Sequence, residues 1–166
     1  MRRQAARLAR RANTARGELR NLVRFQLDET HYAFDVSNVE EVVQPQGVTS
    51  LPYMAASVAG VFDHRGRVTP IVDLRPHFGL PRAGLERHAK WILMRTESGL
   101  VGFAVDRVLD VIGTSDALGP APAVGADADG RAIAGVVHID GDLVFVLDER
   151  RLSAIVAGLS LPEQLP

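Results

Sequence analysis

The chain has 166 residues, of which 46% are hydrophobic, and it contains no cysteine. A chain of this length buries roughly 70% of its unfolded surface, so it needs no covalent staples. The missing cysteine excludes disulfides, thiolate zinc sites and thiol nucleophiles. No apolar run approaches the ~20 residues of a membrane-spanning helix, and the start lacks the apolar centre of a secretory signal. We therefore expect a soluble, cytoplasmic protein.

Charge is distributed unevenly along the chain. The 19 basic residues nearly balance the 20 acidic ones, for a formal net charge of −1. Residues 1–20 hold seven arginines and one glutamate, a net of +6, which leaves −7 for the remainder. A remainder of that charge is a poor platform for nucleic acid. We expect residues 1–20 to be a basic, disordered extension and residues 21–160 to form a single domain.

From residue 22 onward, short runs alternate apolar and polar residues, as β-strands do. The runs at 22–27 and 32–36 are joined by DETH and predict a hairpin, and Asp140-Gly141 predicts another. The other expected strands are 58–62, 67–74, 91–95, 101–105, 133–139 and 142–147. Near the C-terminus, Asp148 is placed to cap a short helix over residues 149–159.

Two segments of the chain align with each other without a gap. Residues 58–75 (VAGVFDHRGRVTPIVDLR) match residues 133–150 (IAGVVHIDGDLVFVLDER), with six of eighteen positions identical. Gly66 and Gly141 fall at equivalent turns, where glycine supplies a positive φ without strain. The repeat indicates two related units within the chain.

A second repeated pattern, valines spaced by three, precedes each unit. These valines are Val36, Val39, Val42 and Val105, Val108, Val111. A spacing of three fits neither a regular strand nor a long helix, but it fits one tight helical turn that joins two strands. We therefore predict an all-β fold of two related small barrels, each made of a hairpin, a valine turn and a glycine-centred hairpin.

No residue pattern supports catalysis or a metal centre. Asp73 and Asp148 end the two units alike, but neither is followed by the hydroxyl and glycine that the paired carboxylates of an aspartic protease need. We interpret both as helix caps. The histidines have no metal-ligand spacing, and those in predicted turns, such as His31 and His64, are expected to face solvent. The sequence predicts a protein that is not an enzyme and holds no cofactor.

The remaining hypothesis is a binding module. Glu40 and Glu41 adjoin the first valine turn, and Arg107 and Asp110 adjoin the second. If the two units pack as equivalents, the turns flank one apolar groove with a charged rim, and such grooves accept partner helices. The alternative is that the valines are core residues only.

Several stretches carry these motifs in one specific combination. They include FQLDETHYAFDVSNVEEVV (25–43), SLP (50–52), VAGVFDHRGRVTPIVDLRPHFGL (58–80), VGFAVDRVLDVI (101–112) and IAGVVHIDGDLVFVLDERRL (133–152). Over about residues 22–157 the chain resembles the CheW family of chemotaxis coupling proteins. The resemblance implies two five-stranded, SH3-like β-barrels around a shared hydrophobic core.

The resemblance also implies a role. Such a protein is a non-enzymatic adaptor that bridges the cytoplasmic tip of a chemoreceptor to the regulatory domain of a CheA-type histidine kinase, and it helps to build the signalling array. It is cytoplasmic and lies with receptor arrays at the inner face of the membrane. It does not insert into the membrane and does not bind nucleic acid.

By matching positions, the resemblance assigns partner contacts to six residues. These are Val39, Glu41, Gly60, Arg65, Val108 and Val111. The first two lie at the turn where the family contacts receptor and kinase, and the last two match its receptor groove. Arg65 fits two roles in the central hairpin, a contact residue or a structural clamp.

Two features depart from the family pattern. The family has Asn at the position of Asp63 and an apolar residue at that of His64, and the basic extension lies outside the pattern. These departures leave open, as an alternative, a coupling protein of a pilus-type or other specialised chemosensory system. A less favoured alternative is a small-barrel nucleic-acid binder that uses its arginine-rich segment.

Overall fold

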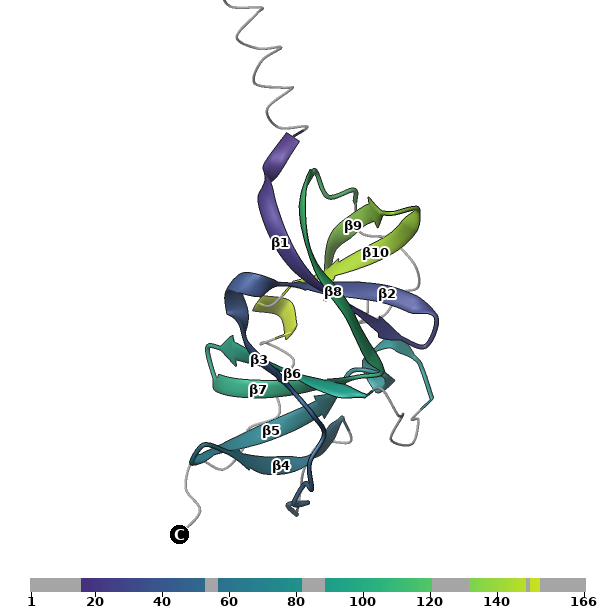
Figure 1. Cartoon of the computed structure of the whole chain (residues 1–166). Helices are drawn as coiled ribbons and strands as arrows, with labels where there is room; N and C mark the ends of the chain where they lie inside the picture. The colour runs from purple at the N-terminus through teal and green to yellow at the C-terminus, as the bar shows by residue number, and fades with distance from the viewer. Residues whose placement is uncertain (1–15, 53–56, 82–88, 121–131, 149, 153–166) are drawn as a thin grey trace, which may run out of the picture.

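The structure is a computed structural model of the chain, and it describes residues 16–52, 57–81, 89–120, 132–148 and 150–152. All eight predicted strands are present, and two more cover the predicted valine turns (Figure 1). The elements are β1 Arg16–Leu27, β2 Thr30–Asp35, η1 Val36–Asn38, β3 Val39–Val43, β4 Val58–His64, β5 Arg67–Asp73, η2 Pro76–Phe78, β6 Lys90–Thr96, β7 Gly99–Val105, β8 Arg107–Asp116, β9 Ile133–Ile139 and β10 Asp142–Leu147. The first strand begins at Arg16, inside the segment expected to be an extension.

The strands form two five-stranded sheets, which confirms the predicted all-β fold. Sheet A has the order β8-β1-β2-β10-β9, and sheet B has the order β3-β6-β7-β5-β4. In each sheet a hairpin pairs in parallel with the strand that ends a repeat unit, β2 with β10 and β7 with β5. The edge strands are exchanged: β3 follows the β1–β2 hairpin but joins sheet B, and β8 follows the β6–β7 hairpin but joins sheet A (Figure 1). Each sheet therefore contains strands from both halves of the sequence.

In each sheet, the segment that follows the exchanged edge strand pairs with the strand at the opposite edge, and this pairing closes the sheet into a barrel. In sheet B, the Thr49 amide donates to the Val61 carbonyl over 2.8 Å, and the Val61 amide donates back over 2.9 Å. In sheet A, Gly119 and Val136 make the same pair of bonds, of 2.8 and 3.2 Å. Because Val61 and Val136 are equivalent in the sequence repeat, both barrels are closed at the same point of the repeat.

A glycine makes room for each closing segment. A methyl group on Gly135 would lie 2.6 Å from the Gly119 carbonyl oxygen, and one on Gly60 would lie 2.8 Å from Cβ of Val48. Contacts under 3.0 Å force something to move. The identity of Gly60 and Gly135 in the repeat therefore has a structural cause, since a side chain there would push the closing segment off its barrel.

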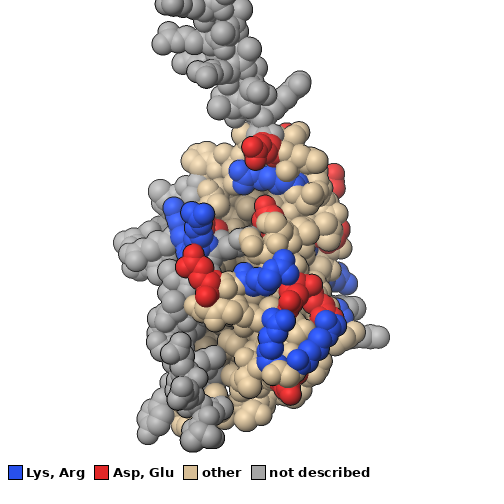
Figure 2. All heavy atoms as spheres, turned by 90° about the vertical axis from the view of Figure 1, so that its left-hand side faces the viewer, with Lys and Arg blue, Asp and Glu red and all other residues tan. Residues whose placement is uncertain are grey.

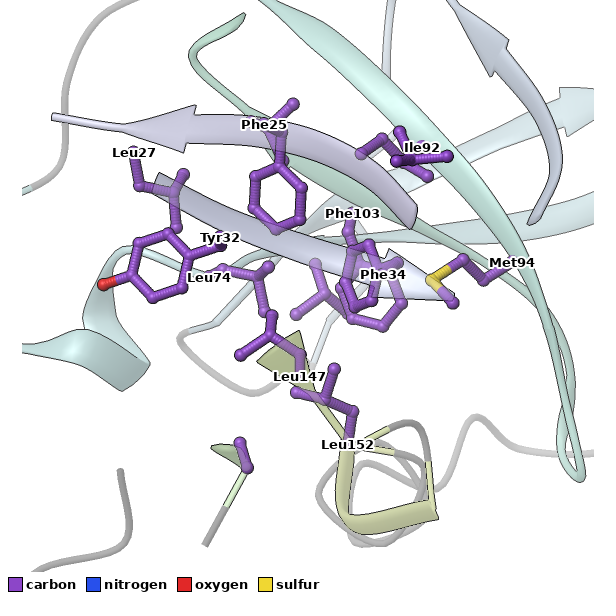
Figure 3. Close-up of a cluster of buried hydrophobic side chains, with 14 of the residues drawn as sticks. Phe25, Leu27, Tyr32, Phe34, Leu74, Ile92, Met94, Phe103, Leu147 and Leu152 are labelled. Atoms are coloured by element: carbon purple, nitrogen blue, oxygen red, sulfur yellow. The ribbon is translucent and has the colours of Figure 1, made fainter. Parts of the chain in front are cut away.

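A core shared by the two sheets joins the barrels, as Figure 3 shows. Phe25 and Phe34 of sheet A stack with ring centroids 5.0 Å apart, and Phe34 meets Phe103 of sheet B at 5.4 Å. Leu152, in the described start of the C-terminal helix, is 2% exposed and packs into the same core. Two smaller apolar clusters lie inside the barrels, one in each.

Aspartates begin the turns that leave each repeat unit. Asp148 accepts hydrogen bonds from the amides of Arg150 and Arg151 at 2.9 and 3.2 Å, which confirms it as a helix cap. The described helix covers residues 150–152, and the remainder of the expected helix lies outside the described residues. Asp73 accepts from the Arg75 amide at 3.0 Å and so fixes a turn, but the 3-10 helix η2 begins later, at Pro76, with Arg75 at its cap position. The interpretation of Asp73 as a helix cap is therefore wrong.

A buried ion pair locks the crossing between the sheets. Arg75 is 5% exposed and follows β5 of sheet B. Its guanidinium binds the Asp106 carboxylate through Nε at 3.0 Å and through Nη2, where β7 passes into β8. Asp106 also accepts from the amide of Asp28, in the β1–β2 turn, at 2.7 Å. Burial alone would lower the pKa of Arg75, but the hydrogen bond and charge of Asp106, together with the charges of Asp28 and Asp73, outweigh it and raise that pKa.

We predict that Gly135→Ala destabilises the fold by about 1–3 kcal/mol, because the new methyl group meets the Gly119 carbonyl oxygen and the Cβ atom of Leu118, neither of which is the free end of a flexible side chain. Urea unfolding checks this value. Gly47→Ala is the matched control, since no atom lies within 4 Å of the added methyl group. A stability loss as large in the control as at Gly135 would contradict the explanation.

We predict that Arg75→Met costs about 3 kcal/mol, since it leaves the largely buried Asp106 carboxylate without its counter-charge. The double variant Arg75→Met/Asp106→Leu should recover most of the loss in the same thermal or urea measurement. Arg150→Met is the control, because Arg150 occupies the equivalent repeat position but is exposed. Equal losses at Arg75 and Arg150 would show that the ion pair is not the cause.

Candidate functional site

Both exchanged edge strands carry a β-bulge between their valines. In β3, Val39 pairs with Met94 and Glu41 with Leu93, so Glu40 is the extra residue. In β8, Val108 pairs with Phe25 and Asp110 with Arg24, so Leu109 is the extra residue. A bulge shifts the alternation of faces by one position, which places valines three apart on the same face.

The bulges correct our prediction of two helical valine turns. The first turn is present, as the 3-10 helix η1 capped by Asp35, whose carboxylate accepts from the Ser37 amide at 2.9 Å. In the second half the chain only bends, at Asp106. The Asp106 carboxylate binds Arg75 and the Asp28 amide, so it does not cap a helical turn as Asp35 does. In both halves the later valines lie in strands, and the bulge rather than a helix accounts for their spacing.

The valines divide into an inner and an outer pair. Val39 and Val108 are half-buried and pack against the shared core. The alternative that the valines are core residues therefore holds for part of the surface of these two. Val42 and Val111 lie farther along the same face and are 39% and 63% exposed. The sequence prediction included Val111 but missed Val42, although the repeated spacing makes the two equivalent.

Glu41 and Arg65, predicted as contact residues, are brought together with a third group. The Nη2 atom of Arg65 lies 3.3 Å from Oε2 of Glu41, and Nε2 of His64 lies 3.3 Å from the same oxygen. Arg65 is largely exposed, its side chain 75% open to solvent, but His64 is only 9% exposed and packs beside Phe62. The expectation that His64 faces solvent is therefore wrong.

The turn that presents Arg65 is built as the sequence predicted. Arg65 and Gly66 have φ of +50° and +84°, and the Asp63 carboxylate accepts from the Gly66 amide at 2.7 Å. Asp140 and Gly141 at the other hairpin have nearly the same φ values, +51° and +85°. The two hairpin tips thus share a backbone but differ in charge, with arginine on one and aspartate on the other.

Gly60 has a different role from the Glu41, His64 and Arg65 cluster. It is on β4, where the closing segment of sheet B crosses, and it contacts Val48 and Thr49 rather than presenting a surface. The described geometry gives Gly60 a structural role, and a contact role stays a prediction.

The acidic residue after the second bulge is also held by a base. Asp110 on β8 accepts from Nε of Arg24 at 2.9 Å and from Nη2 at 2.7 Å. This bidentate hydrogen bond raises the pKa of Arg24 above its usual value. Arg24 lies outside the motifs from which the site was predicted. In the sequence it is marked only as a charged residue at a polar position of the strand pattern over residues 22–27.

The exposed charges on one face of the molecule are mixed rather than segregated. On the face turned to the viewer in Figure 2, basic and acidic side chains of the described residues lie next to one another. That arrangement gives this face no broad basic patch to follow a nucleic-acid backbone. No helix in the described part of the chain is long and apolar enough to cross a membrane.

Known proteins resemble this chain in both sequence and fold. The CheW-like domain profile matches residues 21–156. The chain is 36% identical over 124 residues to the chemotaxis protein CheW of Thermotoga maritima, covering 75% of this chain and 81% of that protein. It is 34% identical over 137 residues to the chemotaxis protein CheW of Treponema pallidum, covering 79% and 80%.

A solved structure has the same architecture. The scaffolding protein TtCheW of Thermoanaerobacter tengcongensis superposes with a TM-score of 0.71 at 26% identity, over 78% of this chain and 84% of that one. The profile match and the two relatives cover most of the chain. The chain therefore belongs to the CheW-like domain family.

Proposed function

We propose that this protein is a non-enzymatic adaptor that couples the cytoplasmic tip of a chemoreceptor to a CheA-type histidine kinase. Family membership supports the chemotaxis role, and the similarity to TtCheW, a scaffolding protein, supports the adaptor role. The structural observation that carries the proposal is the pair of exchanged edge strands. Each presents exposed valine surface beside a carboxylate, so one domain offers two valine-bearing edges for docking.

We assign the β8 edge to the receptor. Val111 is 63% exposed and stands next to the half-buried Val108, which gives an apolar strip on an edge strand. An apolar strip with charged neighbours is the kind of surface on which the helix of a receptor tip docks. The strip is held by the shared core through Val108, so it is presented rigidly.

We assign the hairpin tip of sheet B to the regulatory domain of the kinase. Arg65 and Arg67 project from this tip, with side chains 75% and 64% exposed, and each lies near a glutamate of β3. Their ion pairs with Glu41 and Glu40 have distances of 3.3 and 3.9 Å and lie at the surface, so a partner's charges can exchange with them at little cost.

The direct test is binding of the full chain to each partner. In gel filtration at tens of micromolar, we expect it to co-elute with a receptor-tip fragment and, separately, with the kinase regulatory domain. Failure to co-elute with either one would contradict the adaptor function. Pull-down from cells of the source organism, followed by identification of the kinase, would show which chemosensory system is served.

We predict that Val111→Asp weakens binding of the receptor tip at least tenfold, about 1.4 kcal/mol, because it places a charge in the apolar strip. Titration calorimetry measures the affinity, and the melting temperature should stay nearly constant since the side chain is exposed. Val68→Asp is the control, because Val68 is 59% exposed but lies on β5 of the other sheet. Equal losses in both variants would refute the assignment of β8 to the receptor.

We predict that Arg65→Asn weakens kinase binding several-fold while it lowers stability by less than about 1 kcal/mol, the usual range for an exposed ion pair. Asparagine is chosen because it tolerates the positive φ of this position. The two quantities, measured by calorimetry and urea unfolding, separate the contact role from the clamp role. A stability loss of several kcal/mol with unchanged affinity would make Arg65 a clamp.

A further inference from the structure

Arg24 is a buried cation in the mouth of the sheet A barrel. It is 8% exposed and sits on β1, the strand next to the edge strand β8. Its Nε and Nη2 atoms bind Asp110 of β8, as described above, and its Nη1 atom points toward Asp142 of β10, 4.0 Å from Oδ2. One guanidinium therefore spans from the edge strand to the β9–β10 hairpin across the barrel mouth.

The stability of the fold does not by itself explain a buried arginine at position 24. Nη1 of Arg24 has no hydrogen-bond partner among the described residues, and a buried donor left unpaired costs free energy. Buried ion pairs are often no better for stability than apolar residues of similar size. The equivalent strand position in sheet B shows this within the same chain, because Leu93 stands opposite Glu41 there and is fully buried.

Arg24 instead favours a single register between β1 and β8 beside the bulge. The ladder between β1 and β8 shifts between the pairs Arg24–Asp110 and Phe25–Val108. The extra residue of a bulge is unpaired, and an edge strand has only one neighbour to hold it. If the bulge moved by one residue, a valine of β8 would turn to the opposite face. A bidentate pair at the residue next to the bulge penalises that movement, because its two bonds form only at this alignment.

Sheet B meets the same need by a different route. Its bulge is followed by Glu41, which is held from the β4–β5 hairpin by His64 and Arg65. Sheet A has Ile139 and Asp140 at the matching repeat positions, and neither supplies a positive charge. The base that holds its carboxylate comes from β1 instead.

We propose that Arg24 is a positioning residue for partner binding: through Asp110 it fixes the bulge register of β8 and thereby the presentation of Val108 and Val111 to a receptor helix. This inference rests on the proposed adaptor function for its partner, but the register itself is a property of the free protein. The two parts can therefore be tested separately.

The test variant is Arg24→Leu, which copies the leucine of sheet B. We expect the dissociation constant for the receptor-tip fragment to rise about tenfold or more, and that for the kinase regulatory domain to stay within about twofold. Arg20→Leu, which makes the same charge change on a less buried residue of the same strand, should leave both affinities within about twofold. Unchanged receptor affinity, or an equal loss for both partners, would overturn the proposal.

Hydrogen exchange provides a readout that needs no partner. In Arg24→Leu, we expect the β8 amides around the bulge to exchange at least several-fold faster than in the unmodified chain, while the β3 amides keep their rates. Equal rates in β8 would overturn the register role. If the unmodified chain binds neither partner, the proposed function fails while this measurement still decides the role of Arg24.

A second variant separates geometry from charge and guards against a folding defect in the first. Arg24→Lys keeps the positive charge but loses the planar fork that binds both carboxylate oxygens. We expect it to show faster β8 exchange and weaker receptor binding, as Arg24→Leu does. If lysine restored both to the unmodified values, charge balance rather than register would be the function of Arg24, and the proposal would be wrong.

Discussion

The apolar core shared by the two sheets is the constraint on which the other features of this structure depend. Because β3 and β8 are exchanged, neither half of the sequence can complete a barrel without the other. Within that core, Phe34 stacks on Phe25 of its own sheet and makes a tilted ring contact with Phe103 of the other. The Arg75–Asp106 pair closes the crossing from sheet B to sheet A. The two barrels therefore cannot separate without exposing this core, which suits the proposed adaptor role.

The same core divides the valine surface into a fixed part and a free part. Val39 and Val108 are anchored against it, whereas Val42 and Val111 extend outward along the same face. In the proposed function, a partner would add apolar contact to a surface whose position is already determined, so little conformational entropy would be lost at the interface. The bulges make this possible, because they turn valines that are three residues apart to one side.

Charge distinguishes the two pseudo-equivalent halves. The hairpin tips have the same backbone conformation, but Arg65 stands on one and Asp140 on the other. The carboxylate that follows each bulge binds basic residues from a different element. In sheet B they come from the β4–β5 hairpin, and in sheet A the basic residue is Arg24 of the neighbouring strand β1. A duplicated scaffold would otherwise offer two similar faces. In the proposed function, opposite charge at matching positions would allow two different partners to be distinguished.

Much of the fold was determined by the sequence itself. Alternation located eight of the strands, the gapless repeat indicated two related units, and the turn chemistry of Asp63-Arg65-Gly66 was read correctly, because these signals are local. The motif match also singled out Glu41 and Val111, but the segments that carry them were predicted as helical turns and are edge strands. Only the tertiary structure decided which strands pair, where the bulges lie, and that His64 and Arg24 are buried beside carboxylates. Those features depend on residues that are distant in the chain, as Arg24 and Asp110 are. Local sequence patterns cannot predict such pairings, because they report only on neighbouring residues.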